Sequence, residues 1–207
     1  IMNNKIIIAI DAMGGENAPY KNIEGVSLFL KKDKKDEVFF NLFGNEDLIK
    51  KEIIKYKIST DKYKIFPTST VVSDEETPLA AIKNSKESSM WKSINSQITS
   101  NSKITLSAGN TGVLFVISRM ILKTIETVSK PALAGLWPND VNMNVVLDLG
   151  ANVECDEKNL VDFSEMGAAL YKSLFPEDTP KVALLNIGSE EIKGTDILKK
   201  TYTKLKE

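Results

Sequence analysis

Three glycine-containing junctions in the sequence hold the residues best suited to bind an anion. The clearest is the hexapeptide at 107–112, Ser-Ala-Gly-Asn-Thr-Gly, between an apolar strand pattern and an apolar helix pattern. Small residues let a ligand approach the backbone, and the first turn of a helix offers N–H groups without intrahelical partners. The helix dipole also favours negative charge at that end. The pattern predicts an anion site built from Ser107, Gly109, Asn110, Thr111 and Gly112.

The hexapeptide does not match the common nucleotide-binding loops. No Lys-Ser or Lys-Thr pair follows its last glycine, and its glycines lack the G-x-G-x-x-G spacing of a dinucleotide fingerprint. The alternative interpretation is a plain glycine turn in which Asn110 or Thr111 only caps the helix. The hexapeptide is therefore neither a Walker loop nor a dinucleotide fingerprint, and an anion is its expected ligand.

A second junction follows the first predicted strand, at 11–16. Asp11 stands where that strand ends, and open α/β sheets bind ligands outside the carboxyl ends of their strands. Gly14 and Gly15 form a flexible turn past which a substrate phosphate or a pantetheine arm could lie. The alternative is a strand-to-helix turn in which Asp11 caps backbone N–H groups.

The third predicted site is divided between two further strand ends. Asn152 belongs to the run 148–152, and Asn186 and Gly188 belong to the run 186–194, which also contains Lys193. Asparagine side chains and glycine amides can hold a carbonyl or a phosphate without adding charge, and Lys193 could supply positive charge. The alternative interpretation is a helix start with a solvated lysine.

Composition excludes several classes of protein. The chain has 27 basic and 28 acidic residues, so no basic excess points to nucleic acid as a partner. It has no histidine, which removes the commonest general base and most zinc sites, and we expect neither a metal nor a cofactor. The single cysteine, Cys155, excludes an internal disulfide, fits a reducing cytoplasm, and is expected to be a packed thiol rather than a nucleophile.

Strand-like and helix-like patterns alternate along the chain, which predicts an α/β fold. We expect a doubly wound three-layer α/β/α sandwich with a mostly parallel sheet. Strands are predicted at 5–10, 38–43, 64–67, 132–136, 145–149 and 181–185, and a further strand ends at Leu106. The strand at 145–149 is almost wholly apolar, as expected of a central strand. Helices are predicted at 22–32, 46–56, 78–101, 111–125, 159–174 and 189–206. We expect one domain over 1–207, incomplete at the C-terminus because the last helix has no following strand.

The ordered motifs resemble those of bacterial phosphate acyltransferases, the PlsX family. The match rests on Asp11-Ala12-Met13-Gly14-Gly15, the run 107–112, Asp148-Leu149-Gly150-Ala151-Asn152 and Leu185-Asn186-Ile187-Gly188. Ser88-Ser89-Met90, Lys130-Pro131-Ala132-Leu133 and Lys193-Gly194 also fit the family pattern. One departure is Glu16-Asn17, where the family usually has Asp after the glycine pair. Each motif alone is weak, but the ordered set is specific and extends over essentially the whole chain.

The resemblance implies a fold related to phosphotransacetylases and the isocitrate dehydrogenase-like group. It also implies a reaction in which orthophosphate attacks the thioester of a long-chain acyl carrier protein and gives acyl-phosphate for phospholipid synthesis. The implied partners are acyl carrier protein, orthophosphate, a second copy of the chain, and a membrane glycerol-3-phosphate acyltransferase. The implied location is cytoplasmic, with peripheral association at the membrane. Further sheet strands and a helical segment for dimerisation and membrane docking are expected beyond 207.

In the enzyme interpretation, each predicted site residue receives a role. Asn110, Thr111 and Gly112 would hold phosphate, with Lys193 as charge partner, whereas Asp11, Asn152 and Asn186 would orient the thioester or the pantetheine arm. A metal-dependent decarboxylating dehydrogenase is disfavoured, because Arg119 is the only arginine available for its substrate pocket. The other alternative is a truncated or non-catalytic relative that still binds acyl carrier protein.

Overall fold

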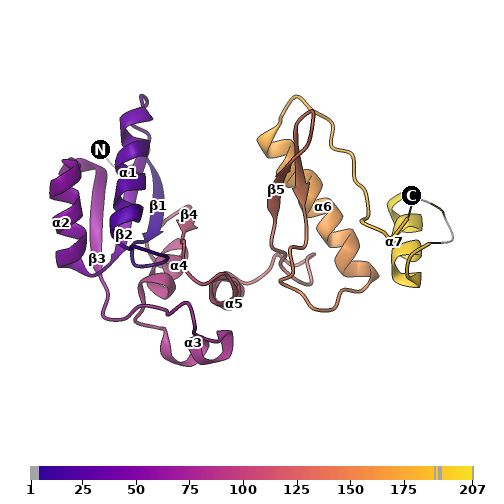
Figure 1. Ribbon diagram of the computed structural model, residues 1–207, viewed down its shortest axis with the longest axis horizontal. Helices are drawn as coiled ribbons and strands as arrows, with labels where there is room; N and C mark the ends of the chain where they lie inside the picture. The colour runs from indigo at the N-terminus through magenta and orange to yellow at the C-terminus, as the bar shows by residue number, and fades with distance from the viewer. Residues whose placement is uncertain (1–4, 189, 191–192, 207) are drawn as a thin grey trace. The chain divides into compact units, whose positions relative to one another are not determined.

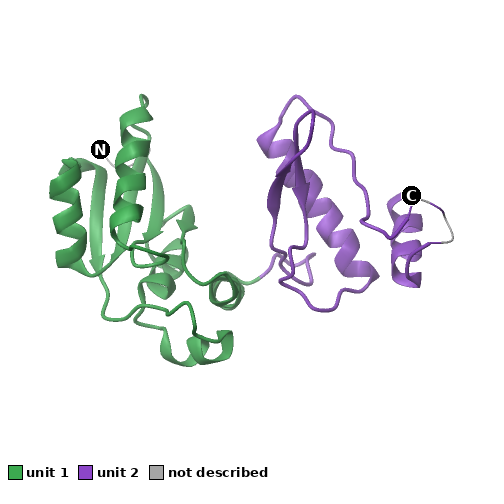
Figure 2. Cartoon of the chain, in the orientation of Figure 1, with its two compact units in different colours: residues 1–123 green, residues 124–207 purple. Residues whose placement is uncertain are grey.

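The computed structural model describes residues 5–188, 190 and 193–206. The chain divides into two compact units, Ile1–Lys123 and Thr124–Glu207 (Figure 2). Each unit has its own elements and is described by itself. The single domain over 1–207 stays a prediction.

The first unit contains a four-stranded parallel sheet in the order β3-β2-β1-β4 (Figure 1). Its strands are β1 (Ile6–Asp11), β2 (Val38–Gly44), β3 (Tyr63–Pro67, preceded by the short 3-10 helix Thr60–Lys62) and β4 (Ile104–Leu106). Every residue of β2 is buried, as expected of an apolar strand in a parallel sheet with both faces covered.

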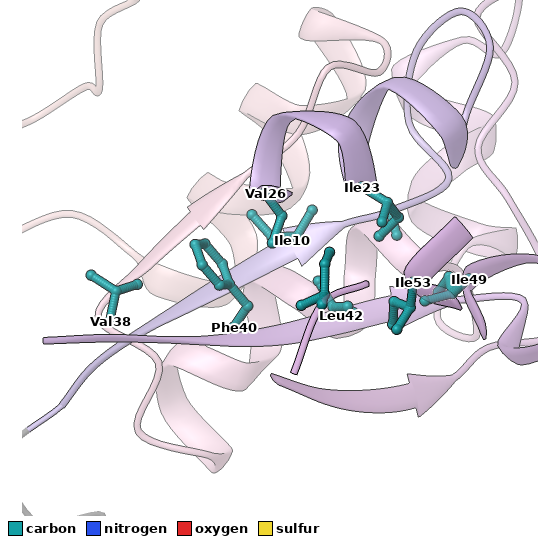
Figure 3. Packing of buried hydrophobic residues seen from close by; sticks show 10 residues of the cluster. Ile10, Ile23, Val26, Val38, Phe40, Leu42, Ile49 and Ile53 are labelled. Carbon is teal, nitrogen blue, oxygen red and sulfur yellow. The ribbon is translucent and has the colours of Figure 1, made fainter. Parts of the chain in front are cut away.

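One face of the sheet packs against α1 (Tyr20–Lys32) and α2 (Glu46–Tyr56). Alternate residues of a strand point to the same face, so Ile10, Phe40 and Leu42 meet the apolar sides of both helices. Figure 3 shows this cluster, in which Leu42, Ile23 and Ile49 are fully buried. This layer is the main apolar core of the unit.

The opposite face packs against α4 (Ser89–Thr99) through polar contacts. Asn41 Nδ2 donates to Ser102 Oγ at 3.1 Å, Ser96 Oγ donates to the same oxygen at 2.9 Å, and Thr105 Oγ1 donates to the Ser93 carbonyl at 3.0 Å. Beyond these contacts, α4 shares a second apolar cluster with α5 (Thr111–Leu122). Helices therefore cover both faces, and the predicted α/β/α layering is confirmed.

The predicted long helix over 78–101 is wrong, because the chain forms α3 (Pro78–Asn84) and α4 with a turn between them. Serines cause the break: Ser88 N donates to the Ser85 carbonyl at 2.8 Å, and Ser88 Oγ accepts the Trp91 N–H at 3.1 Å. A serine at that position caps a new helix more readily than it continues an old one.

The second unit contains a separate two-stranded antiparallel sheet, β5 (Gly135–Pro138) with β6 (Met143–Val146). The prediction that 132–136 and 145–149 join a parallel sheet is therefore wrong. Asn139 Oδ1 accepts the N–H groups of Val141 and Asn142 at 2.8 and 2.7 Å, which closes a short turn. Two strands joined by so short a turn can only run antiparallel.

The remaining elements of the second unit are α6 (Glu157–Leu174) and α7 (Asp196–Lys206). The predicted strand over 181–185 is absent: the segment is irregular, and Leu185 is 92% exposed. An apolar run forms a strand only beside another strand, and the described residues offer it none. The last helix was expected from 189, but it begins at Asp196, and residues 189, 191 and 192 lie outside the described part of the chain.

Candidate functional site

The first two predicted junctions meet at the carboxyl edge of the parallel sheet. Strands β1 and β4 are neighbours, with Ile10 opposite Leu106, so Asp11 and Ser107 leave the sheet side by side. The chain continues from β1 into α1 on one face, and from β4 into α5, which packs with α4 on the other face. Strands whose connections leave toward opposite faces define a switch point, where open α/β sheets bind ligands.

A short hydrogen-bond chain joins the two junctions. Ser107 Oγ donates to Asp11 Oδ2 at 2.7 Å and accepts the Gly109 N–H at 3.1 Å. One hydroxyl thus links the end of β1 to the backbone just before α5. Because the Gly109 N–H is already bound, it is not available to a ligand in this geometry.

The Asp11 carboxyl is almost fully enclosed, with 1% of the residue exposed. Burial raises the pKa of Asp11, while the nearby hydroxyls of Ser89 and Ser107 and the backbone of Met13 and Gly14 pull it down less strongly. Asp11 Oδ1 and Ser89 Oγ are both buried, and neither has a hydrogen-bond partner among the described residues.

Gly14 and Gly15 permit the two loops to touch. A Cβ on Gly14 would lie 2.6 Å from Asp11 Oδ2 and 2.9 Å from Ser107 Oγ, and Gly15 has φ +85° with the Ala108 carbonyl close by. Positive φ and such close approach both favour glycine. The space left by these glycines is therefore taken up by the loop at 107–109, and their contact with a substrate stays a prediction.

Asn110 caps α5 and ties it to a neighbouring loop. Its Oδ1 accepts the Val113 N–H at 3.1 Å, and its Nδ2 donates to the carbonyls of Asp74 and Glu76 at 2.9 and 3.1 Å. These bonds use both ends of the amide. Thr111 and Gly112 are exposed, and no hydrogen bond of their backbone N–H groups is found among the described residues, so these two groups are the donors open to an anion.

The third predicted site lies in the second unit as two separate clusters. In the first, Asp148 Oδ1 accepts the Leu133 N–H at 2.7 Å, and Oδ2 accepts the Asn152 backbone and side-chain N–H groups at 2.7 and 3.1 Å. Asn152 Nδ2 also donates to the Pro131 carbonyl at 2.9 Å. Partial burial raises the pKa of Asp148, but these hydrogen bonds outweigh it and leave the pKa below its usual value.

The lowered pKa of Asp148 predicts an acid-sensitive contribution to stability. Asp148→Asn places an N–H donor where at least one backbone or side-chain N–H now donates to the carboxylate. We therefore expect the free energy of unfolding to fall by about 1–2 kcal/mol near neutral pH. The contribution is present above the unfolded pKa, about 4, and fades as pH falls through the lower folded pKa. Urea unfolding of wild type and variant at several pH values measures this difference.

The matched control is Asp140→Asn, in the exposed turn between β5 and β6, where no side-chain bond of Asp140 is found among the described residues. It should change stability by less than about 0.5 kcal/mol at any pH. A gap between wild type and Asp148→Asn that stays constant down to acid pH would contradict the charge-dependent role.

The second cluster consists of Asn186, Gly188 and Lys193. Asn186 Nδ2 donates to the Lys193 carbonyl at 3.2 Å, and its Oδ1 accepts the Ile187 N–H at 2.8 Å. A Cβ on Gly188 would meet Lys193 Cγ at 3.2 Å, so these residues are near one another. The Lys193 side chain is exposed, and its pairing with the loop at 107–112 stays a prediction.

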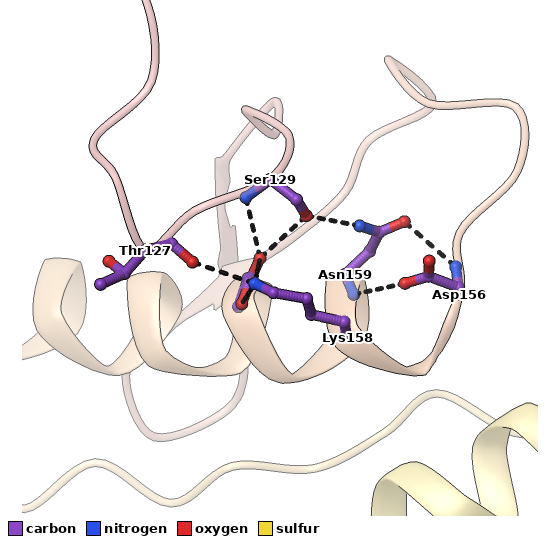
Figure 4. A network of polar contacts seen from close by, with 6 residues as sticks. Thr127, Ser129, Asp156, Lys158 and Asn159 are labelled. Carbon is purple, nitrogen blue, oxygen red and sulfur yellow. Dashed lines mark hydrogen bonds and ion pairs between the residues drawn. The ribbon is translucent and has the colours of Figure 1, made fainter.

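A further polar network in the second unit was missed from the sequence (Figure 4). Ser129 N and Oγ both donate to Asp162 Oδ2 at 3.0 Å, Lys158 Nζ pairs with the same carboxylate at 3.0 Å, and Asn159 Nδ2 donates to Ser129 Oγ at 2.7 Å. The Asp156-x-x-Asn159 capping box at the start of α6 was the available signal. The network anchors the segment before β5 onto α6.

The described residues give little support to a cysteine nucleophile, a metal site or a membrane-spanning helix. Burial raises the pKa of the Cys155 thiol, which disfavours a thiolate nucleophile. No group of three or more cysteine or carboxylate side chains within residues 5–188, 190 and 193–206 could hold a metal ion. In the same part of the chain, no helix has the length and apolar character needed to cross a membrane.

The fold and the paired loops define a class of protein. It is an α/β protein whose parallel sheet has a switch point between β1 and β4, at the carboxyl edge where such sheets bind ligands. Comparison with known proteins is more specific. The chain belongs to the family described as fatty acid synthesis protein, whose model matches residues 6–207. This membership and the relatives' names confirm the resemblance drawn from the motifs.

Curated relatives in this family are named phosphate acyltransferase. The chain is similar to the phosphate acyltransferase of Pelagibacter ubique (strain HTCC1062). The two are 50% identical over 206 residues, which is 100% of this chain and 61% of the relative. It is 40% identical over 208 residues to that of Ehrlichia ruminantium (strain Gardel), covering 100% of this chain and 61% of the relative. It is 41% identical over 200 residues to that of Clostridium botulinum (strain Alaska E43 / Type E3), covering 97% and 60%. The chain thus spans about three fifths of the length of these relatives.

Proposed function

We propose that the protein is a phosphate acyltransferase and that orthophosphate binds at the N-terminus of α5. The observation that carries this proposal is the pair of open N–H groups on Thr111 and Gly112, located beside the β1/β4 switch point. The name shared by the relatives supports the reaction class. Asn110 fixes the first turn of the helix, so the donors are held in position before phosphate arrives.

The reaction needs position and charge more than a protein base. An oxygen of orthophosphate attacks the thioester carbon, the carbonyl becomes an oxyanion, and the carbon–sulfur bond breaks to give acyl-phosphate and a thiolate. A substantial part of orthophosphate near neutral pH is already the nucleophilic dianion, so a chain without histidine can carry out this chemistry. Lys193 is proposed to supply positive charge, and Asn152 and Asn186 to orient the thioester or its pantetheine arm.

The finer parts of the proposal concern donor and partners. We expect a long-chain acyl group carried on acyl carrier protein, and a product used in phospholipid synthesis. A homodimer at the inner face of the membrane, next to a membrane glycerol-3-phosphate acyltransferase, would hand on the unstable acyl-phosphate. These expectations come from the family resemblance.

The test is phosphate-dependent release of thiol. The longest natural form of the protein is incubated with long-chain acyl carrier protein, and free thiol is measured with and without orthophosphate. Asn110→Ala should reduce phosphate-dependent release at least 10-fold, since the cap positions the first turn of α5 and a displacement of about 1 Å in positioned groups can cost about 10²-fold. Asn45→Ala is the matched control, because Asn45 caps α2 through the same bond, to Leu48 N at 3.1 Å, away from the site.

Each other outcome points elsewhere. Thiol release that does not depend on phosphate would identify a thioesterase and contradict the proposal. No release from a folded protein would favour a non-catalytic module that binds acyl carrier protein. Equal loss in Asn110→Ala and Asn45→Ala would show that helix capping alone matters.

A further inference from the structure

The bond between Asp11 and Ser107 joins two segments that lie 96 residues apart in the chain. Ser107 follows β4 directly, and Ala108, Gly109 and the cap residue Asn110 separate it from the open N–H groups of α5. The Ser107 hydroxyl therefore holds the backbone of the short segment that leads into Thr111 and Gly112.

Asp11 is poorly suited to touch the phosphate itself. It is 1% exposed, its Oδ2 is occupied by the Ser107 hydroxyl, and a carboxylate would repel a phosphate dianion. Its buried position suits a fixed acceptor, because a charge-assisted hydrogen bond in a dry environment is strong and well oriented.

We propose that Asp11 is a positioning residue that acts through Ser107: it holds the hydroxyl that binds the Gly109 N–H and so fixes the loop at 107–109 in the form that offers Thr111 and Gly112 to orthophosphate. This inference rests on the proposed function for its ligand. The hydrogen-bond chain from Asp11 through Ser107 to the Gly109 N–H, here called the tether, is independent of the reaction. This positioning role replaces the role predicted for Asp11 from the sequence, which was to orient the thioester or the pantetheine arm.

The tether has a steric counterpart. A Cβ on Gly14 would lie within 3 Å of Asp11 Oδ2, Ser107 Oγ and Gly109 N, so the pair is packed with no spare room on that side. A well-packed tether reduces the number of loop conformations in the free protein. Less ordering is then required when phosphate binds.

The experiment measures KM for orthophosphate and kcat in the longest natural form, for wild type, Asp11→Asn, Ser107→Ala and the double variant. We expect each single variant to raise KM roughly 10-fold, since small displacements of positioning groups cost one to two orders of magnitude. The double variant should be no worse than either single variant, because both remove the same tether. Ser107→Thr, which keeps the hydroxyl, should restore most of the affinity.

Contrary results are equally defined. Additive effects in the double variant would overturn the proposal, because the two residues would then act independently. A fall in kcat at unchanged KM in Asp11→Asn alone would also overturn it and would place Asp11 at the reacting atoms. Unchanged KM in all folded variants would reduce the pair to a structural contact.

A second readout works on the 207-residue chain and separates this inference from the proposed function. The Gly109 amide should be protected from hydrogen exchange in wild type and exchange faster in Asp11→Asn and Ser107→Ala, while the Gly25 amide within α1 stays unchanged. If wild type shows no phosphate-dependent thiol release but Gly109 behaves in this way, the function is wrong and the tether stands. Unchanged exchange at Gly109 would overturn the tether whatever the activity.

Discussion

Gly14→Ala is expected to lower the free energy of unfolding by about 2–3 kcal/mol, the cost of forcing a methyl group into a packed site. The new Cβ would lie 2.6 Å from Asp11 Oδ2 and 2.9 Å from both Ser107 Oγ and Gly109 N. Ordinary contacts require more than 3 Å, and one of these three atoms belongs to the backbone, so the loops after β1 and β4 must separate. Since that separation breaks the Asp11–Ser107 bond, affinity for orthophosphate should fall with stability.

Gly25→Ala provides the control for this substitution. Gly25 lies inside α1 and nothing stands within 4 Å of its Cβ position, so the same change there should stabilise the protein by up to about 1 kcal/mol through helix propensity. Urea unfolding monitored by circular dichroism compares the two variants with wild type. A Gly14→Ala protein as stable as wild type would contradict the close packing of the two loops.

Leu42→Ala is expected to destabilise the first unit by about 3–4 kcal/mol, within the range for truncating a buried leucine. Leu42 is fully buried in the middle of β2, within the cluster that joins the sheet to α1 and α2 (Figure 3). Its truncation removes apolar contacts and leaves a cavity between layers that cannot close freely. Denaturant titration measures the shift in unfolding midpoint.

Leu79→Ala makes the same chemical change at a surface position. Leu79 is 69% exposed in α3, and alanine is at least as good a helix former as leucine, so the expected change is below about 0.5 kcal/mol. Equal destabilisation by the two substitutions would show that the cluster around Leu42 is not the main source of stability in this unit.

Much of the first unit could be predicted from local patterns. The strands at β1, β2 and β3 and the helices α1 and α2 follow from apolar periodicity, and their observed bounds differ from the predicted ones by two residues or fewer. The cap at Asn110 was also visible, because an asparagine before an apolar run is a local signal. The second unit was predicted less well. A segment such as 181–185 forms a strand only beside a partner strand, and local sequence patterns do not identify that partner.

The sequence by itself determined the candidate residues for anion binding, the alternation of strands and helices, and the absence of histidine chemistry. Only the tertiary structure decided that β4 pairs with β1, which brings Ser107 to Asp11 and commits the Gly109 N–H and the Asn110 side chain to internal bonds. It also decided that residues 135–146 form an antiparallel hairpin. The physical reason is that strand order and loop contact depend on which distant segments bury surface together, whereas periodicity and caps depend on residues a few positions apart.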